Sequence, residues 1–188
     1  MPGAAFINPR AFRHVWHNNA ALCQLDFALY AHGFGLLPSE IDEPSWAAAA
    51  NLCSELVDLS GSPTETERRY VCNGSFDLDG RPVDIMEDLL TASLGSIVWT
   101  QGKLKGYASG ATASSFSLTT DDLRGNISVT TRPSRDNIFN AVRGTYLDES
   151  TFIPTSFAPV TNSFYEAEDG GERIWEDIQL PFTRGHAR

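Results

Sequence analysis

Apolar residues recur at helical spacing in three stretches of the first half of the chain. The first stretch predicts a helix over Ala20–His32, because Asn19 is a favourable N-cap and the span contains neither glycine nor proline. Gly33 follows at the position where helices commonly end with a glycine. The predicted buried face of this helix comprises Leu22, Leu25 and Leu29.

A second helix is predicted over residues 44–57. Asp42, Glu43 and Pro44 form its start signal, since proline lacks the N–H group that the first helical turn leaves unpaired. One face of this helix is continuously apolar, which predicts that it packs against the core. That face comprises Trp46, Ala49, Ala50, Cys53 and Val57.

A third helix is predicted to begin at Pro82 and to end at Gly95. Its inward-facing residues would be Ile85, Met86, Leu89 and Leu90. A β-hairpin should follow, formed by Ile97–Thr100 and Lys103–Lys105. Gln101–Gly102 would be its two-residue turn, because such turns require positive φ and glycine adopts it without strain.

The connecting segments are interpreted from their polar and turn-forming residues. Residues 60–67 are predicted to form a loop, Arg69–Phe76 a strand, and Asp77–Gly80 the turn that ends it. The small polar residues of Ser109–Ser117 indicate an internal linker. Thr119–Leu123 has the sequence of a short, capped helical turn.

The last third of the chain alternates strand-like runs with turn residues. The predicted strands are Ile127–Thr131, Asn140–Tyr146, Phe164–Glu166 and Arg173–Leu180. In the final strand, Ile174, Ile178 and Leu180 share a face with Glu176 between them, a half-buried pattern. A helix-rich half followed by a strand-rich half predicts an α+β fold. We expect an irregular leader over 1–18, a helical and hairpin subdomain over 19–110 and a β-rich subdomain over 111–188.

Composition and charge narrow the class of protein. The 188 residues are 41% hydrophobic and 20% charged, which is typical of a globular chain. The formal net charge is −10, and the few basic residues are scattered, so nucleic-acid binding is not expected. The sequence shows no secretory signal pattern and no apolar run long enough to span a bilayer, and we expect a soluble protein made in a bacterial cytoplasm. Cys23, Cys53 and Cys72 lack metal-ligand spacing and are predicted to be buried, reduced thiols.

Three local groupings suggest chemistry, but each has a simpler interpretation. His14 and His17 have the spacing of a helical metal site, yet no third ligand lies near them in the sequence. Asp77–Gly80 resembles the start of a calcium loop, but Pro82 occupies the position that requires glycine. No metal and no other cofactor is therefore expected.

The carboxylates of Asp84, Glu87 and Asp88 are the candidates for an enzyme of the cell-wall hydrolase class, which needs two carboxylates on either side of a sugar. Their place near the start of a helix is also where the helix dipole favours negative charge, and we expect no enzyme activity. A carbohydrate-binding module using Trp99 or Trp175 is a further alternative.

Eight segments, taken in order, resemble the tail-tip (host-specificity, tip attachment) proteins of lambda-like siphophages. They are Asn19–Asp42, Trp46–Glu55, Arg69–Gly74, Asp84–Leu90, Ile97–Lys103, Leu118–Gly125, Phe139–Gly144 and Ala167–Ile174. Each segment alone is unspecific, whereas their common order over residues 19–182 is specific. The resemblance ends after Thr183, at Arg184–Arg188.

The resemblance implies a tail hub-like α+β segment of a protein that closes the tail tube and links it to the receptor-binding apparatus. Family members are longer, so the chain would be a truncated central hub segment: a prophage remnant, part of a split gene or a trimmed piece. The expected partners are further copies of the chain, a trimer in the family, and other phage tail proteins; the expected location is the virion tail tip. Missing neighbours should leave an apolar interface exposed, with the candidates Phe152, Phe157, Phe164 and Trp175.

Overall fold

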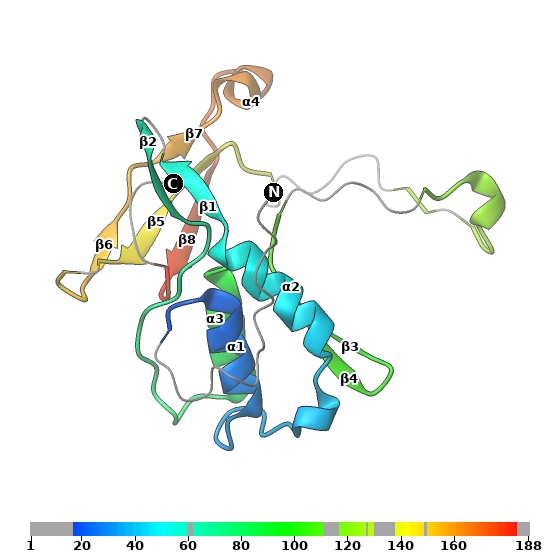
Figure 1. The fold of residues 1–188 in the computed structure, drawn as a ribbon. Coiled ribbons are helices and arrows are strands. Elements are labelled where there is room, and N and C mark those ends of the chain that lie inside the picture. Colours follow the sequence, from blue (N-terminus) through cyan, green and yellow to red (C-terminus); the bar gives the residue numbers. More distant parts are fainter. Residues whose placement is uncertain are drawn as a thin grey trace. The chain divides into compact units, whose positions relative to one another are not determined.

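The computed structural model describes residues 17–59, 62–110, 117–126, 128–129, 138–148 and 150–183 (Figure 1). Helices predominate early and antiparallel strands later, which confirms the predicted α+β class. The chain forms two compact units. The first comprises Met1–Ser109, Gly144–Ala158 and Gln179–Arg188, and the second Gly110–Arg143 and Pro159–Ile178. The division into 1–18, 19–110 and 111–188 stays a prediction.

The three predicted helices of the first unit are present. They are α1 (Ala20–Leu29), α2 (Glu43–Ser54) and α3 (Pro82–Thr91). The predicted caps explain where the first two begin: Asn19 Oδ1 accepts a hydrogen bond from the N–H of Leu22, and Asp42 Oδ2 accepts one from the N–H of Ser45. Helix α1 ends at Leu29, three residues before the predicted end, because Tyr30 is already extended. No helix in these described stretches is both long and apolar enough to cross a bilayer.

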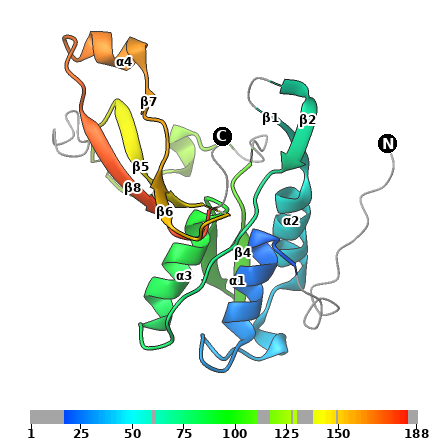
Figure 2. The same cartoon turned by 90° about the vertical axis from the view of Figure 1, so that its left-hand side faces the viewer.

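The core of the first unit lies where the three helices meet strand β4 (Lys103–Tyr107). Helix α1 packs against both α2 and α3, and α2 also packs on β4 (Figure 2). The predicted inward faces are largely confirmed, although Leu29 and Leu90 are only half-buried. The largest apolar side chains that are almost completely buried are those of Trp46 and Met86. This core fixes the positions of the three helices by burying apolar surface.

The region after α2 differs from the prediction. The helix ends at Ser54 instead of continuing through Val57, and two short antiparallel strands follow, β1 (Leu56–Leu59) and β2 (Ser62–Arg68). The predicted loop over 60–67 is therefore wrong. Glu55 adopts extended backbone angles, and the β-branched and alternating residues beyond it suit a two-stranded ribbon. The polar residues of this segment indicated a loop, but a two-stranded ribbon can form from polar residues because it has little need of an apolar face.

The strand predicted over Arg69–Phe76 is also wrong. Only isolated bridges form there, between Val71 and Asn19 and between Cys72 and Thr183. Beyond them the chain runs without regular structure to the predicted turn over Asp77–Gly80, where Asp77 Oδ1 accepts from the N–H of Asp79. The segment is held by single contacts with distant parts of the chain, which sequence pattern does not reveal.

The predicted hairpin is confirmed as β3 (Ser96–Thr100) and β4, with Thr100 opposite Lys103 and Trp99 opposite Leu104. Gln101 and Gly102 have φ values of 54° and 73°, as a type I′ turn requires. A short 3₁₀ helix, η2 (Pro38–Glu40), precedes α2. The predicted capped turn at Thr119–Leu123 is confirmed as the 3₁₀ helix η3 (Thr120–Asp122).

The later strands are β5 (Ala141–Leu147), β6 (Pro154–Ser156), β7 (Val160–Thr161) and β8 (Trp175–Leu180). Strand β5 pairs with each of the other three. The predicted strands at 140–146 and 173–180 are confirmed, but Phe164–Glu166 lies in helix α4 (Ser163–Glu168). Of the strand predicted over 127–131, only residues 128 and 129 are described, and both lie outside any strand. Most of the predicted linker over 109–117 also lies outside the described residues.

Candidate interaction surface

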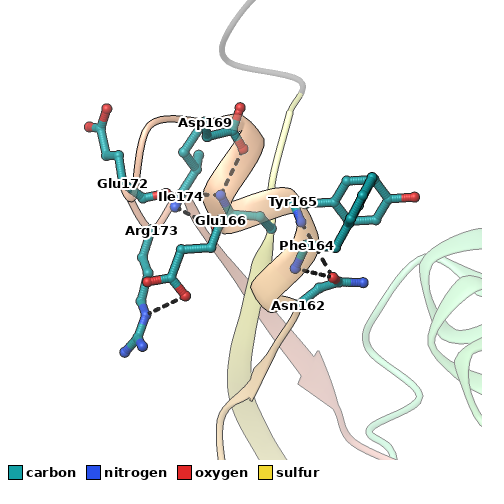
Figure 3. A network of polar contacts seen from close by, with 9 residues as sticks. Asn162, Phe164, Tyr165, Glu166, Asp169, Glu172, Arg173 and Ile174 are labelled. Carbon is teal, nitrogen blue, oxygen red and sulfur yellow. Dashed lines mark hydrogen bonds and ion pairs between the residues drawn. The ribbon is translucent and has the colours of Figure 1, made fainter.

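A single buried asparagine, Asn140, closes the loop over residues 162–174, which carries α4. The side chain of Asn140 is 6% exposed, and its Nδ2 donates to Oδ2 of Asp169 at 2.7 Å and to the main-chain oxygen of Glu172 at 2.9 Å. Its Oδ1 accepts from the N–H of Ile174 at 2.9 Å. Figure 3 labels these three partners in the close-up of the loop. Both the nitrogen and the oxygen of the side-chain amide are thus used to hold one end of the loop.

The main chain of the same asparagine fixes both ends of the loop. The N–H groups of Asn140 and Ala141 each donate to the oxygen of Ile174 at 3.1 Å. The oxygen of Asn140 accepts from the N–H of Asn162 at 3.1 Å. Asn162 and Ile174, at the two ends of the loop, are therefore both hydrogen-bonded to the main chain of Asn140. The ends lie close together, and the loop is closed.

Helix α4 has defined signals at both ends. Asn162 Oδ1 accepts from the N–H groups of Phe164 and Tyr165 at 3.0 and 3.4 Å, which satisfies two donors of the first turn (Figure 3). Gly170 and Gly171 then have φ values of 75° and 84°, the left-handed geometry that ends a helix. The predicted strand over 164–166 failed because the aromatic residues are β-prone, whereas the asparagine cap decides the local structure.

An ion pair joins the two sides of the loop. Arg173 Nε lies 3.2 Å from Oε2 of Glu166 (Figure 3). Surface pairs of this kind stabilise by roughly 0–1 kcal/mol, so this pair adds little to what Asn140 provides.

The closed loop presents two aromatic side chains to solvent. Phe164 is 64% exposed and Tyr165 is 51% exposed, and their ring centroids lie 5.5 Å apart in an edge-to-face arrangement. Large aromatic side chains that are exposed together on a fixed backbone are typical of protein-interaction surfaces. Phe164 was predicted from the sequence. Tyr165 was not among the residues predicted as an interface.

Trp175, the second predicted residue in this unit, is half-buried. The guanidinium of Arg143 lies 5.4 Å from the centroid of the Trp175 ring and is held there by Asp177, whose Oδ1 is 2.6 Å from Nε. The hydrogen bond from Arg143 lowers the pKa of the Asp177 carboxyl. Trp175 is therefore covered in part by a charged neighbour and presents less apolar surface than Phe164.

In the first unit, Phe152 lies in a tight turn that one carboxylate organises. Asp148 Oδ1 accepts from the N–H and the hydroxyl groups of Ser150 and Thr151, at 2.6 to 3.0 Å. These hydrogen bonds, the one from the Ser150 hydroxyl foremost, lower the pKa of Asp148 to about 2. Phe152 donates its N–H to the oxygen of Asp148 at 2.8 Å and has a φ of 54°, and its side chain is exposed.

Phe157 is half-buried, and its N–H donates to the oxygen of Gly144 at 3.2 Å. The four residues predicted as an interface are thus divided between the units: Phe152 and Phe157 belong to the first, and Phe164 and Trp175 to the second. That they form one interface stays a prediction.

The carboxylates considered for catalysis lie on α3. Asp84 is engaged by Arg81, whose Nη2 lies 2.6 Å from Oδ1, while Glu87 and Asp88 are exposed. An ion pair with a residue in the preceding turn and a place near the helix start, where the helix dipole favours negative charge, agree with the simpler interpretation of these carboxylates. Within the described ranges, no three histidine, cysteine or acidic side chains are grouped so as to hold a metal ion. His14 lies outside these ranges.

The three cysteines come together, although their sequence positions give no sign of it. A side-chain hydrogen bond joins Cys23 and Cys72, and Cys53 lies near enough to Cys72 to affect its ionisation. That hydrogen bond and burial raise the pKa of the Cys72 thiol. Each thiol is reduced, Cys53 and Cys72 are buried, and Cys23 is half-buried. The raised pKa makes Cys72 a poor nucleophile, whereas the same hydrogen bond lowers the pKa of the Cys23 thiol. The prediction of buried thiols therefore holds for Cys53 and Cys72 but not for Cys23.

No protein-family model matches the chain, and no curated protein shows significant similarity to it.

Proposed function

We propose that this chain is a structural component of a bacteriophage or prophage tail tip, and that it acts by assembling with other proteins. The ordered resemblance of eight segments over residues 19–182 to tail-tip proteins is the basis of the proposal. The family role is a central hub, so the proposed partners are copies of the chain itself and neighbouring tail proteins. The proposed location is the tail tip of the virion, after synthesis in the host cytoplasm.

The observation in the structure that best supports an assembly role is the aromatic pair of α4. Phe164 and Tyr165 are exposed although the backbone beneath them is fixed by the Asn140 hydrogen bonds. Two exposed aromatic rings lack the stabilisation that burial of their apolar surface would give, and ordering the closed loop that carries them costs conformational entropy. Neither cost has an evident benefit in the isolated chain. Contact with a partner would supply that benefit, since aromatic side chains are enriched at interface centres.

The proposal is tested on particles of the phage, or induced prophage, that encodes the chain. Purified particles are analysed by mass spectrometry, and gold-labelled antibody raised against the chain is located by electron microscopy. The expected result is the chain in intact particles and label at the end of the tail away from the capsid. Complete, infectious particles that lack the chain would overturn the proposal.

A cell-wall zymogram distinguishes the enzymatic alternative. The expected result is no clearing by the wild-type chain. Clearing that disappears in Glu87→Gln, while the exposed-residue control Glu168→Gln retains it, would assign a hydrolase activity to the α3 carboxylates and contradict a purely structural role.

A further inference from the structure

Strand β3 is the open edge of the β3–β4 hairpin. Among the described residues it pairs only with β4. The opposite side of β4 is occupied: the oxygen of Leu104 accepts from the N–H of Asp42 and from the indole of Trp46, both at 3.0 Å. The N–H of Gly106 donates to the hydroxyl of Ser45 at 3.3 Å. A further strand could therefore join this hairpin only beside β3.

The sequence of β3 is suited to pairing. Its five residues, Ser-Ile-Val-Trp-Thr, carry no charge and no proline, and three of them are β-branched. Val98 is 46% exposed and Trp99 is 53% exposed, on opposite faces of the strand. Natural edge strands usually carry a charge, a proline or a bulge that prevents pairing with another chain. This edge carries none of these, and Figure 1 shows the hairpin beside α2.

The charge on the hairpin is opposite to that of the rest of the chain. Lys103 and Lys105 are the only lysines in a sequence with a formal net charge of −10. Both lie in β4, where the register places Lys103 opposite Thr100 and Lys105 opposite Val98, on the face that points away from the core. Neither is paired with a carboxylate of the described residues.

The geometry points to β3 as the docking edge for an extended, acidic segment of a partner protein, which adds as a third strand. Main-chain hydrogen bonds to β3 would supply the pairing, and alternate side chains of the added strand would lie on the two faces of the hairpin. On the face with Val98, acidic side chains would approach the two lysines. On the other face, an apolar side chain would contact Trp99. This inference does not rest on the proposed tail-tip role.

An acidic strand is favoured over other anionic partners. Two lysines are few for a nucleic acid or an anionic membrane, both of which the acidic remainder of the chain would repel. An extended segment with alternating acidic and apolar residues instead matches three features of the hairpin at once: the open edge, the lysine face and the exposed ring of Trp99.

The test uses the full chain labelled with ¹⁵N and a synthetic eight-residue peptide that alternates glutamate and valine. The expected result is weak binding that perturbs the amide resonances of residues 96–100 and slows their hydrogen exchange. Two control peptides isolate the two components of recognition. One has lysine in place of glutamate, and the other is N-methylated at alternate residues so that one edge cannot pair. Each should bind at least tenfold more weakly.

Matched variants test the lysines. Lys103→Glu combined with Lys105→Glu should weaken peptide binding about tenfold or more, because attraction becomes repulsion. Arg81→Glu combined with Arg124→Glu changes the formal charge by the same amount at exposed positions that are not part of the hairpin, and should change affinity less than twofold. Circular dichroism confirms that both variants remain folded.

Three results would each overturn the inference. The first is binding that does not use the strand edge, shown by equal affinity of the N-methylated peptide or by resonance changes confined to residues outside β3 and β4. The second is tighter binding of a ten-nucleotide single-stranded DNA than of the acidic peptide, which would assign the lysines to phosphate. The third is a dimer in sedimentation velocity with protected amides at 96–100, which would assign the edge to a second copy of the chain.

Discussion

The indole Nε1 of Trp46 donates a hydrogen bond of 3.0 Å to the main-chain oxygen of Leu104, which links α2 to β4. The same oxygen accepts from the N–H of Asp42, so it remains satisfied if the indole is removed. Trp46 is only 1% exposed, and its main contribution is therefore the volume and apolar surface of the ring.

Trp46→Ala should accordingly lower the free energy of unfolding by roughly 3–5 kcal/mol, the range for emptying a large core site. Trp46→Phe should lower the free energy of unfolding less, because a large aromatic ring is retained and the oxygen of Leu104 still accepts from the N–H of Asp42. Urea denaturation measures both values. Trp99→Ala serves as the matched control at a half-exposed tryptophan and should cost clearly less than Trp46→Ala. Equal losses at the two positions would show that Trp46 is not a core residue.

The turn between β3 and β4 depends on Gly102. Its φ is 73°, and a side chain placed there would meet no other atom within 4 Å, so the backbone angle alone decides the effect. Gly102→Val should destabilise the chain by about 1 kcal/mol or more, because β-branched residues adopt positive φ badly. Thermal unfolding is the measurement. Gly125→Val, at a glycine with equally open surroundings and no positive φ, should leave the midpoint nearly unchanged.

These examples show what the sequence could predict. Asn19, Asp42 and the Gln101–Gly102 pair act through neighbouring residues, and their effects are therefore visible in a local pattern. The three helices, the hairpin and the α+β class followed from such signals. The ribbon of β1 and β2 did not, because its polar alternation is equally compatible with a loop.

The residues that build the candidate surface could not be predicted, because they act over long sequence separations. Asn140 holds residues about thirty positions away, and no periodicity marks it. Cys23 and Cys72 meet because α1 and the segment at Val71 are bridged, which is a result of the tertiary fold. Exposed aromatic residues such as Phe164 could be proposed from the sequence, but their fixed presentation could not.

Asn140→Asp should release the α4 loop. The substitution keeps the acceptor for the N–H of Ile174, but it removes both donors and places a carboxylate 2.7 Å from that of Asp169. The loss of two hydrogen bonds at a buried site should cost roughly 1–3 kcal/mol. Hydrogen exchange over residues 162–174 should accelerate more than that of α2. Asn126→Asp, at an exposed position, is the control and should change neither region.

The hydrogen bonds at Asp148 should make the free energy of unfolding depend on pH in the acidic range only. Its folded-state pKa of about 2 lies below the ordinary value of 3.8, so its contribution to stability is complete above the unfolded value and is lost as the pH falls through the folded one. The difference in unfolding free energy between wild type and Asp148→Asn should therefore shrink as the pH is lowered from 5 to about 2. Asp121→Asn, a carboxylate outside this turn, is the control. A difference that stays constant over this range would show that the hydrogen bonds at Asp148 do not stabilise the fold.

The aromatic pair of α4 leads to the last prediction, which concerns self-association. If the chain assembles as proposed, Phe164 and Tyr165 should contact a neighbouring copy through a heterologous, cyclic interface, since such interfaces close into rings. Sedimentation velocity over a wide concentration range should then detect weak association. Phe164→Ser combined with Tyr165→Ser should reduce it strongly without lowering thermal stability, because both side chains are exposed in the single chain. Tyr30→Ser, at an exposed tyrosine in the first unit, should leave association unchanged. A strictly monomeric wild-type chain at the highest concentration would show that this pair is not an interface between copies, and its partner would then have to be sought among other proteins.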